Sequence, residues 1–139
     1  MSDVYNLQRF VKAQDRVIDQ VLNELRNGRK TSHWMWFIFP QIKGLGNSPM
    51  AREFAISSVA EAEAYVAHEI LGARLRQCTE LVNAVDGRTA HEIFGSPDDL
   101  KFRSSMTLFA QAVKGDNPFS EALRKYFGSK PDQLTIERL

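Results

Sequence analysis

Cysteine is nearly absent from this sequence, which contains Cys78 and no other cysteine among its 139 residues. A single cysteine excludes an intrachain disulfide, as is common for proteins of reducing compartments. Cys78 and the three histidines show no Cys-x-x-Cys or His-x-x-x-His spacing. We therefore expect no metal site, and nothing in the sequence indicates a cofactor.

An excess of positive charge is also missing. Eighteen Lys and Arg residues face seventeen Asp and Glu residues, which leaves a formal net charge of +1. A protein dedicated to binding nucleic acids normally carries a strong basic excess, so we expect no general nucleic-acid binding. The composition still allows a local basic patch, and an anionic small molecule is the partner that we expect.

Long hydrophobic runs do not occur either. The longest extends from Trp34 to Phe39, whereas a membrane-spanning helix needs about 20 apolar residues. The N-terminal residues MSDVYNLQRF have neither the basic nor the apolar region of a signal peptide. We expect a cytoplasmic protein without a membrane segment, present as a monomer or a weak homo-oligomer.

Helix signals recur along the chain. The segment from Leu7 to Leu25 repeats apolar residues at intervals of three and four, which predicts one helix with Gln14 as its polar interruption. Further start signals are Ser48-Pro49, Ser58, Thr89, Ser96-Pro97, Asn117-Pro118 and Pro131-Asp132. The helix that begins at Ser96 should extend to about Lys114. Because hairpin signals are missing, the sequence predicts one compact all-α domain, residues 1–139, with about seven to eight helices, several of them short.

The segment SHWMWFIFPQ, residues 32–41, contains both tryptophans of the chain, Trp34 and Trp36. Ser32 can cap a helix and Pro40 ends one, so we favour a short buried helix, with a buried strand as the alternative. The first interpretation of its aromatic side chains is that they form the core. The second is that Trp34 and Trp36 bind a ligand by stacking on a planar ring.

His33 stands directly before these tryptophans and is the candidate catalytic residue. A histidine side chain titrates near neutral pH, so it can carry a proton during a reaction. The alternative is a histidine that is exposed to solvent or hydrogen-bonded at a helix start.

The loop KGLGNSP, residues 43–49, is the candidate anion site. Gly44 and Gly46 allow backbone N–H groups to turn toward one point. Ser48 begins a helix whose N-terminus favours an anion, and Lys43 adds charge. The loop lacks the third glycine of a dinucleotide fingerprint and the Gly-Lys-Ser/Thr of a P-loop. The alternative is an ordinary turn between helices.

The segment DDLKFRSSMTLF, residues 98–109, is a second group of polar candidates. Lys101 and Ser105 are four residues apart on the expected helix, a spacing that would suit a serine–lysine nucleophile. No oxyanion hole or strained elbow accompanies them, so we favour phosphate binding by Lys101, with hydroxyl groups from Ser104 and Ser105. Arg103 and Thr107 would support the same role.

Four segments of the chain resemble the sequences of a known family. They are HWMWFIFPQIKGLGNS, EAEAYVAHEILGARL, IFGSPDDLKFRSSMTLFA and the closing TIERL. The chain resembles the domain-of-unknown-function family 1810, a bacterial family without established activity that is sometimes mislabelled calpastatin. The likeness extends from about Phe10 to Leu139. It implies a compact, mostly helical domain and carries over no catalytic residues.

A looser likeness concerns a family that handles NAD and ADP-ribose derivatives and includes N-glycosidases. His33-Trp34 and Lys101-Phe102 are similar to two short sequence motifs of that family. The glutamate that precedes the histidine there is replaced here by Ser32. A carboxylate is the natural stabiliser of an oxocarbenium-like transition state, so glycosidase chemistry does not follow from the likeness.

Two functional hypotheses result. In the first, the protein binds, and as an enzyme hydrolyses, a phosphate-bearing nucleotide-like ligand such as an NAD or ADP-ribose derivative. In the second, it is a non-enzymatic adapter that binds another protein. A polar cleft that joins His33, Lys43 and Lys101 would favour the first, and a flat apolar patch would favour the second.

Overall fold

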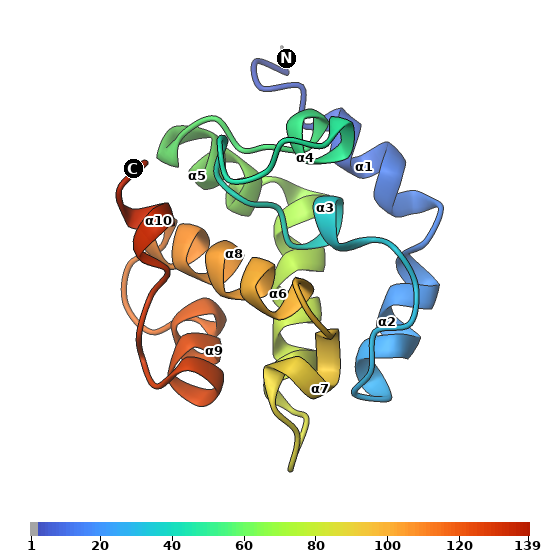
Figure 1. The fold of residues 1–139 in the computed structure, drawn as a ribbon. Coiled ribbons are helices and arrows are strands. Elements are labelled where there is room, and N and C mark those ends of the chain that lie inside the picture. Colours follow the sequence, from blue (N-terminus) through green and yellow to red (C-terminus); the bar gives the residue numbers. More distant parts are fainter. Residues whose placement is uncertain (1–2) are drawn as a thin grey trace.

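The computed structural model of the protein describes residues 3–139 (Figure 1). These residues form ten helices: α1 (Gln8–Asp15), α2 (Ile18–Arg26), α3 (Met35–Ile38), α4 (Pro49–Glu53), α5 (Val59–Ala67), α6 (Glu69–Asn83), α7 (Ala90–Phe94), α8 (Asp98–Ala112), α9 (Pro118–Phe127) and α10 (Gln133–Ile136). One isolated parallel bridge joins Ile42 and Ile56. The prediction of an all-α fold is confirmed, whereas the predicted count of seven to eight helices is too low.

The predicted number of helices was too low, in part because one apolar stripe extends over two helices. The chain leaves helical geometry between α1 and α2, where Val17 has φ −133° and ψ −3°. Phe10 on α1 and Val21 on α2 are both fully buried, so the apolar spacing continues across the break. The helices α3 and α10 have four residues each. Hydrophobic periodicity cannot resolve helices of about one turn.

Side-chain caps confirm most of the predicted helix starts. Each capping side chain accepts a hydrogen bond from the backbone N–H three residues further along. The confirmed caps are Ser48, Ser58, Thr89, Asn117 and Asp132. Ser96 is the exception, because α8 begins at Asp98 and its N-cap position is occupied by Pro97 without a side-chain bond. This helix ends at Ala112, before the predicted Lys114.

The helix α8 lies at the centre of the packing. It contacts α5, α7, α9 and α10, while α6 contacts α2, α5 and α9. The face of α8 that carries Phe102, Met106 and Phe109 is fully buried. The first turns of α8 extend toward α7, and this end of the helix also carries the polar residues of the candidate site.

The aromatic segment forms a single helical turn within the core. Residues Met35–Ile38 are α3, which decides between the helix and the strand left open by the sequence. Trp34, Phe37 and Phe39 are buried, as predicted. The ring of Phe39 packs edge-on against Phe94 at 5.9 Å and Phe102 at 5.0 Å. These contacts join α3 to α7 and to the beginning of α8.

Gln14 has a structural role that explains its place on an apolar face. Its amide nitrogen donates to the Phe37 carbonyl at 2.7 Å and to the Tyr65 hydroxyl at 2.9 Å. Both partners are buried, and burial raises the pKa of Tyr65. One amide thus connects α1, α3 and α5 and satisfies polar groups that water cannot reach.

Candidate functional site

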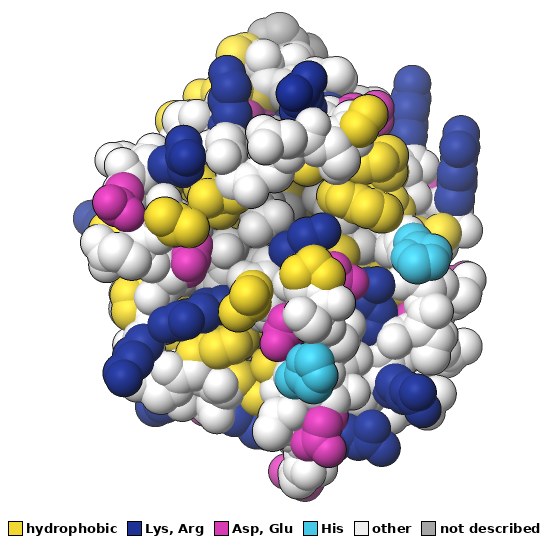
Figure 2. Space-filling view, in the orientation of Figure 1, with side chains coloured by type: hydrophobic (Ala, Val, Ile, Leu, Met, Phe, Trp, Pro, Cys, Tyr) yellow, Lys and Arg dark blue, Asp and Glu magenta, His cyan; other side chains and the backbone are white. Residues whose placement is uncertain are grey.

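A cleft of about 450 Å³ lies between the loop that precedes α4, the first turns of α8 and the start of α10. It is lined by Gln41, Leu45, Gly46, Asn47, Ser48, Ala51, Pro97, Leu100, Lys101, Arg103, Ser104, Asp132 and Leu134. The three segments meet on the face shown in Figure 1, and Figure 2 shows hydrophobic, basic and acidic side chains next to one another on this face. The fold therefore brings the predicted loop to the predicted Lys101 helix.

The loop is closed at its base by backbone hydrogen bonds. The Lys43 N–H donates to the Ile56 carbonyl at 2.8 Å, and the Ile56 N–H donates to the Gln41 carbonyl at 2.9 Å. The next residue, Gly44, has φ +99°, a backbone conformation that favours glycine. A Cβ at this position would lie 2.5 Å from Nη1 of Arg138, at the end of a flexible side chain. The wall that the loop gives to the cleft is thus fixed at its base.

Lys101 carries a charge that is incompletely compensated. Its Nζ lies 3.8 Å from Oδ1 of Asp98. The other oxygen of that carboxylate lies only 2.9 Å from Nζ of Lys30. Two ammonium groups and one carboxylate leave one positive charge in this cluster. The Lys101 ammonium also lies 5.5 Å from the centre of the Trp36 ring, whose face attracts a cation.

Arg103 lines the cleft but is engaged in holding the C-terminal segment. Its Nε donates to the Lys130 carbonyl at 3.0 Å, and its Nη2 donates to the Pro131 carbonyl at 3.2 Å. The guanidinium also lies 5.6 Å from the centre of the Phe127 ring. These contacts fix the residues that lead into α10, so we assign Arg103 mainly to the support of the cleft wall.

Ser104 is joined to Asp132 across the cleft wall. The Ser104 hydroxyl lies 3.0 Å from Oδ2 of Asp132 and 3.1 Å from the Leu100 carbonyl. The backbone N–H and the hydroxyl of Thr135 donate to the same Oδ2, at 3.2 and 2.6 Å. The second oxygen of Asp132, Oδ1, accepts no hydrogen bond from the described part of the chain. It remains available to a donor in the cleft.

Ser105 and Thr107 do not reach the cleft, although the sequence grouped them with Ser104. Ser105 is fully buried, and its hydroxyl has no hydrogen-bond partner among residues 3–139. The Thr107 hydroxyl donates to the Arg103 carbonyl at 2.9 Å and accepts from the Asp132 N–H at 2.8 Å. These side chains face the interior of the fold, where Thr107 supports the start of α10.

His33 and Trp34 also lie outside the cleft. His33 is exposed, while Trp34 is 1% exposed and donates its indole N–H to Glu24 at 3.0 Å. The Glu24 carboxylate further accepts hydrogen bonds from Ser32 and Thr31. Burial opposes the ionisation of Glu24, but the hydrogen bonds from Ser32, Thr31 and Trp34 outweigh it and lower its pKa to about 2. This buried carboxylate positions the beginning of the aromatic segment.

Lys43 lies on the opposite side of the loop from Lys101. It lines a second hollow of about 390 Å³ together with Gly44, Asn47, Arg52 and other residues. Gly46 and Asn47 are shared by this hollow and the cleft. The predicted anion site around the loop is therefore divided into two spaces, and the expected cleft that joins His33, Lys43 and Lys101 does not form.

The N-terminus of α4 offers less to an anion than the sequence indicated. This helix has five residues, and Pro49 at its first position has no N–H. The Ala51 N–H donates to the Ser48 hydroxyl at 3.1 Å, and the Arg52 N–H donates to the Ser48 carbonyl at 3.0 Å. With these donors occupied, the charge of a ligand has to be met mainly by side chains.

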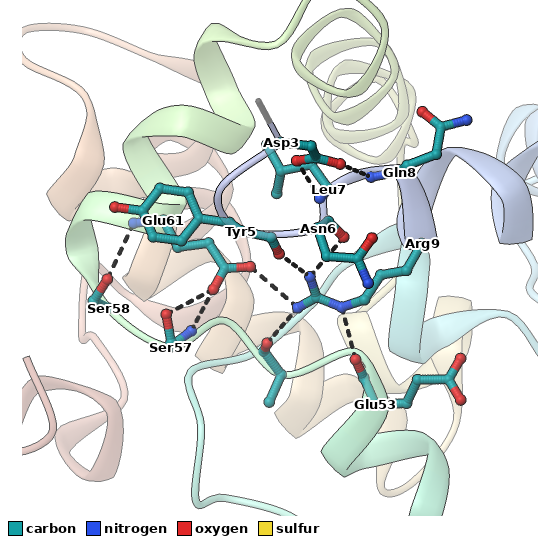
Figure 3. A network of polar contacts seen from close by, with 11 residues as sticks. Asp3, Tyr5, Asn6, Leu7, Gln8, Arg9, Glu53, Ser57, Ser58 and Glu61 are labelled. Carbon is teal, nitrogen blue, oxygen red and sulfur yellow. Dashed lines mark hydrogen bonds and ion pairs between the residues drawn. The ribbon is translucent and has the colours of Figure 1, made fainter. Parts of the chain in front are cut away.

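A network around Arg9 was not found from the sequence (Figure 3). The guanidinium donates to the carbonyls of Tyr5, Asn6, Glu53 and Ala55 at 2.6 to 2.9 Å, and it pairs with Glu61 at 3.1 Å. Ser58 and Glu61 have the sequence spacing of a capping box, in which the Glu61 carboxylate would accept from the Ser58 N–H. Instead, its Oε1 accepts from the N–H and hydroxyl of Ser57 at 2.9 and 2.7 Å. No sequence signal links Arg9 to Glu61, which are 52 positions apart.

Neither a metal centre nor a membrane helix is found in the part of the chain that the structure describes. No group of three or more His, Cys, Asp or Glu side chains has the arrangement that could hold a metal ion. None of the helices of residues 3–139 combines the length and the hydropathy needed to cross a bilayer. Cys78 is buried, and burial raises the pKa of its thiol to about 12.

Comparisons with known proteins agree with the fold. A family model described as "Protein of unknown function (DUF1810)" matches residues 4–139. The chain is similar to the crystal structure of the conserved hypothetical protein Rv1873 from Mycobacterium tuberculosis, with 54% sequence identity and a TM-score of 0.97. That alignment covers 99% of this chain and 98% of the other. No curated protein matches the sequence.

Proposed function

This chain belongs to the DUF1810 family of proteins of unknown function, and we propose that it binds a small, phosphate-bearing, nucleotide-like molecule in the cleft between its loop and α8. The observation that carries this proposal is the incompletely compensated charge of Lys101. Its neighbour Asp98 is shared with Lys30, which lies 0.9 Å closer to that carboxylate, at 2.9 rather than 3.8 Å. A ligand phosphate at the Lys101 ammonium would supply the missing negative charge.

The remaining walls suit the other parts of such a ligand. Leu100 and Leu134 are 57% and 61% exposed and both line the cleft. Exposed leucines on two sides of one cleft would hold an apolar ring between them. The free Oδ1 of Asp132 would accept a hydrogen bond from a sugar hydroxyl or an amino group. The volume of about 450 Å³ lies in the range of roughly 300–1,000 Å³ that small-molecule sites occupy.

The proposal assigns roles that differ from those expected from the sequence. Trp36 holds the Lys101 ammonium over its ring, so it positions the cation and does not stack on the ligand. Trp34 and Ser105 are buried and support the fold. His33 does not line the cleft, so the proposal concerns binding and assigns no catalytic residue.

The second candidate function is the binding of another protein. The observation that favours it is the same pair of exposed leucines, which would also suit an apolar side chain of a peptide. The two candidates differ in their dependence on charge. A phosphate-bearing ligand needs Lys101, whereas an apolar peptide side chain needs the leucines.

The test is a titration of the protein with AMP, ADP-ribose and inorganic phosphate, followed by backbone amide chemical shifts. We expect shifts at Gly46, Ser48 and Lys101, and affinity that falls with added salt. Lys101→Met keeps the aliphatic stem and removes the charge, and it should weaken binding by about tenfold or more. Lys114→Met, at an exposed lysine beyond the far end of α8, is the matched control.

Two results would decide against this function. The amides of the cleft would stay in place at millimolar AMP and ADP-ribose, or Lys101→Met and Lys114→Met would bind equally well. A peptide that shifts the same amides, and that loses its affinity in Leu100→Ser and Leu134→Ser but not in Lys101→Met, would support the second candidate.

A further inference from the structure

Another concave surface, separate from the cleft and from the hollow beside Lys43, lies on the other side of α4. This groove, of about 450 Å³, runs between α1 and the segment formed by α3 and α4. Its floor includes Phe37, Met50 and Phe54, and the rings of the two phenylalanines lie 5.3 Å apart. Figure 2 shows hydrophobic side chains gathered beside α1 and α4 at the upper right, with basic side chains extending from their edge.

The basic rim comes from α1. Lys12 and Arg16 are four residues apart, so both lie on the side of α1 that borders the groove. Both are exposed, and no acid of residues 3–139 lies within ion-pair distance of either. Glu53 is the carboxylate that lines the groove. Arg9 also lines the groove, but its charge is met by Glu61. The other two cations and one carboxylate leave a net positive charge along an apolar floor.

The Arg9 network keeps the two walls of this groove apart at a fixed distance. Arg9 extends from α1 and donates to the carbonyls of Glu53 at 2.7 Å and Ala55 at 2.8 Å, at the end of α4 (Figure 3). Its own charge is met by Glu61. The groove is therefore set by hydrogen bonds of the half-buried Arg9 side chain and does not depend on the exposed rim residues.

We propose that this groove binds a small amphipathic anion, namely an acyl chain or an aromatic ring that ends in a carboxylate or a phosphate. The apolar part would lie on Met50, Phe37 and Phe54, and the anionic end would meet Lys12 and Arg16. The half-buried Ala13 lies between these two cations on α1 and leaves room for the chain to pass. This site is separate from the cleft of the proposed function and does not depend on it.

The test compares four probes on the full chain by backbone amide chemical shifts. Octyl phosphate and phenyl phosphate contain both an apolar part and an anion, inorganic phosphate has only the anion, and octanol has only the apolar part. We expect the two amphipathic probes to shift the amides of Ala13, Met50 and Phe54 at concentrations at which inorganic phosphate and octanol do not. The cleft is monitored separately through Gly46, Ser48 and Lys101.

Three variants sharpen this test. The double variant Lys12→Ala with Arg16→Ala should bind octyl phosphate about fivefold to tenfold more weakly, because both lost charges are exposed. Arg26→Ala removes an exposed arginine from the last turn of α2 and is the control. Ala13→Leu fills the groove and should prevent binding of octyl phosphate. Circular dichroism checks that each variant remains folded.

Several outcomes would overturn the proposal. The amides of Ala13, Met50 and Phe54 would not respond to millimolar octyl phosphate, or octanol would shift them as strongly, which would show a hydrophobic patch without charge recognition. Equal affinity of the double variant and Arg26→Ala would likewise exclude a role of the basic rim. The double variant keeps this test valid even if Ala13→Leu does not fold.

Discussion

Arg9 and Lys101 each lie over an aromatic ring and beside a carboxylate, but only Arg9 has its charge and its donors fully used. The Arg9 guanidinium lies 4.4 Å from the centre of the Phe10 ring, pairs with Glu61 at 3.1 Å and donates to four backbone carbonyls. The Lys101 ammonium has one carboxylate partner at 3.8 Å, which is shared with another lysine.

This difference separates a structural ion pair from a candidate binding site. A buried charge without partners is costly, so a network such as that of Arg9 is complete within the protein. A binding residue has to keep interaction capacity for its ligand and can do so at low cost only where water also reaches it. The Arg9 and Lys101 side chains are 16% and 29% exposed, and their carboxylate partners Glu61 and Asp98 are 4% and 20% exposed, which agrees with this distinction.

The largest effect is expected for Arg9→Ala. Removing the guanidinium leaves Glu61 without a cation and the carbonyls of Tyr5, Glu53 and Ala55 without their donor, which should lower the free energy of unfolding by about 3–5 kcal/mol. Chemical denaturation measures this loss. Arg9→Lys should recover only part of it, because an ammonium cannot supply the five donors of a planar guanidinium. A loss below about 1 kcal/mol in Arg9→Ala would show that the network is not structural.

The next largest effect is expected for Glu24. Its carboxylate accepts hydrogen bonds from Thr31, Ser32 and Trp34, and none of its partners is a cation. Its pKa is lowered from 4.5 to about 2 in the folded protein. The contribution of the ionised Glu24 to the free energy of unfolding is therefore complete above pH 4.5. It is lost as the pH falls toward 2, by about 3 kcal/mol in total. Urea denaturation between pH 6 and 2.5 should show a steeper decline for the wild type than for Glu24→Gln. Parallel profiles would contradict this role.

Unlike Arg9→Ala, Lys101→Met should weaken ligand binding while changing stability little. Methionine keeps an aliphatic stem of similar length, and the lost pair with Asp98 is partly exposed, so the unfolding free energy should change by less than about 1 kcal/mol. Binding of AMP or ADP-ribose should fall by about tenfold or more. Denaturation and titration of the same variant measure both quantities. A loss of several kcal/mol in stability would place Lys101 with Arg9 among the structural cations.

The smallest effect is expected for Ser105→Ala. The hydroxyl of Ser105 is buried without a partner in the described chain, so its removal should leave the unfolding free energy unchanged or raise it by up to about 1 kcal/mol. Ligand binding should not change either. Thermal denaturation and the AMP titration test both points. A clear loss of binding would show that Ser105 contributes to the cleft.

Capping residues were predicted well because their interactions are local. The Ser48, Asn117 and Asp132 side chains bond to backbone groups three residues away, so neighbouring sequence alone specifies them. Ser96 is the exception, since Pro97 takes the N-cap position and α8 begins one residue later. The break at Val17 was also missed, because both helices bury the same apolar stripe.

The candidate site was predicted only in part. The loop with Gly46 and Ser48 and the helix with Lys101 line one cleft, as the sequence hypothesis placed them. Lys43 points into another hollow, and His33 does not line the cleft. Asp132 joins it from the other end of the chain. Which side of a loop faces a helix depends on contacts such as the bridge between Ile42 and Ile56, and no local pattern encodes these contacts.

The sequence by itself determined the all-α class, most of the helix starts and the burial of the aromatic segment. Each of these depends on intrinsic backbone preferences or on apolar side chains that leave water wherever they are placed. Tertiary structure alone decided that Arg9 meets Glu61, that Asp98 is shared by Lys30 and Lys101, and that the charge of Lys101 is only partly compensated. Charge compensation depends on distances between residues far apart in the chain, because the interaction of two charges weakens with their separation and with the water between them.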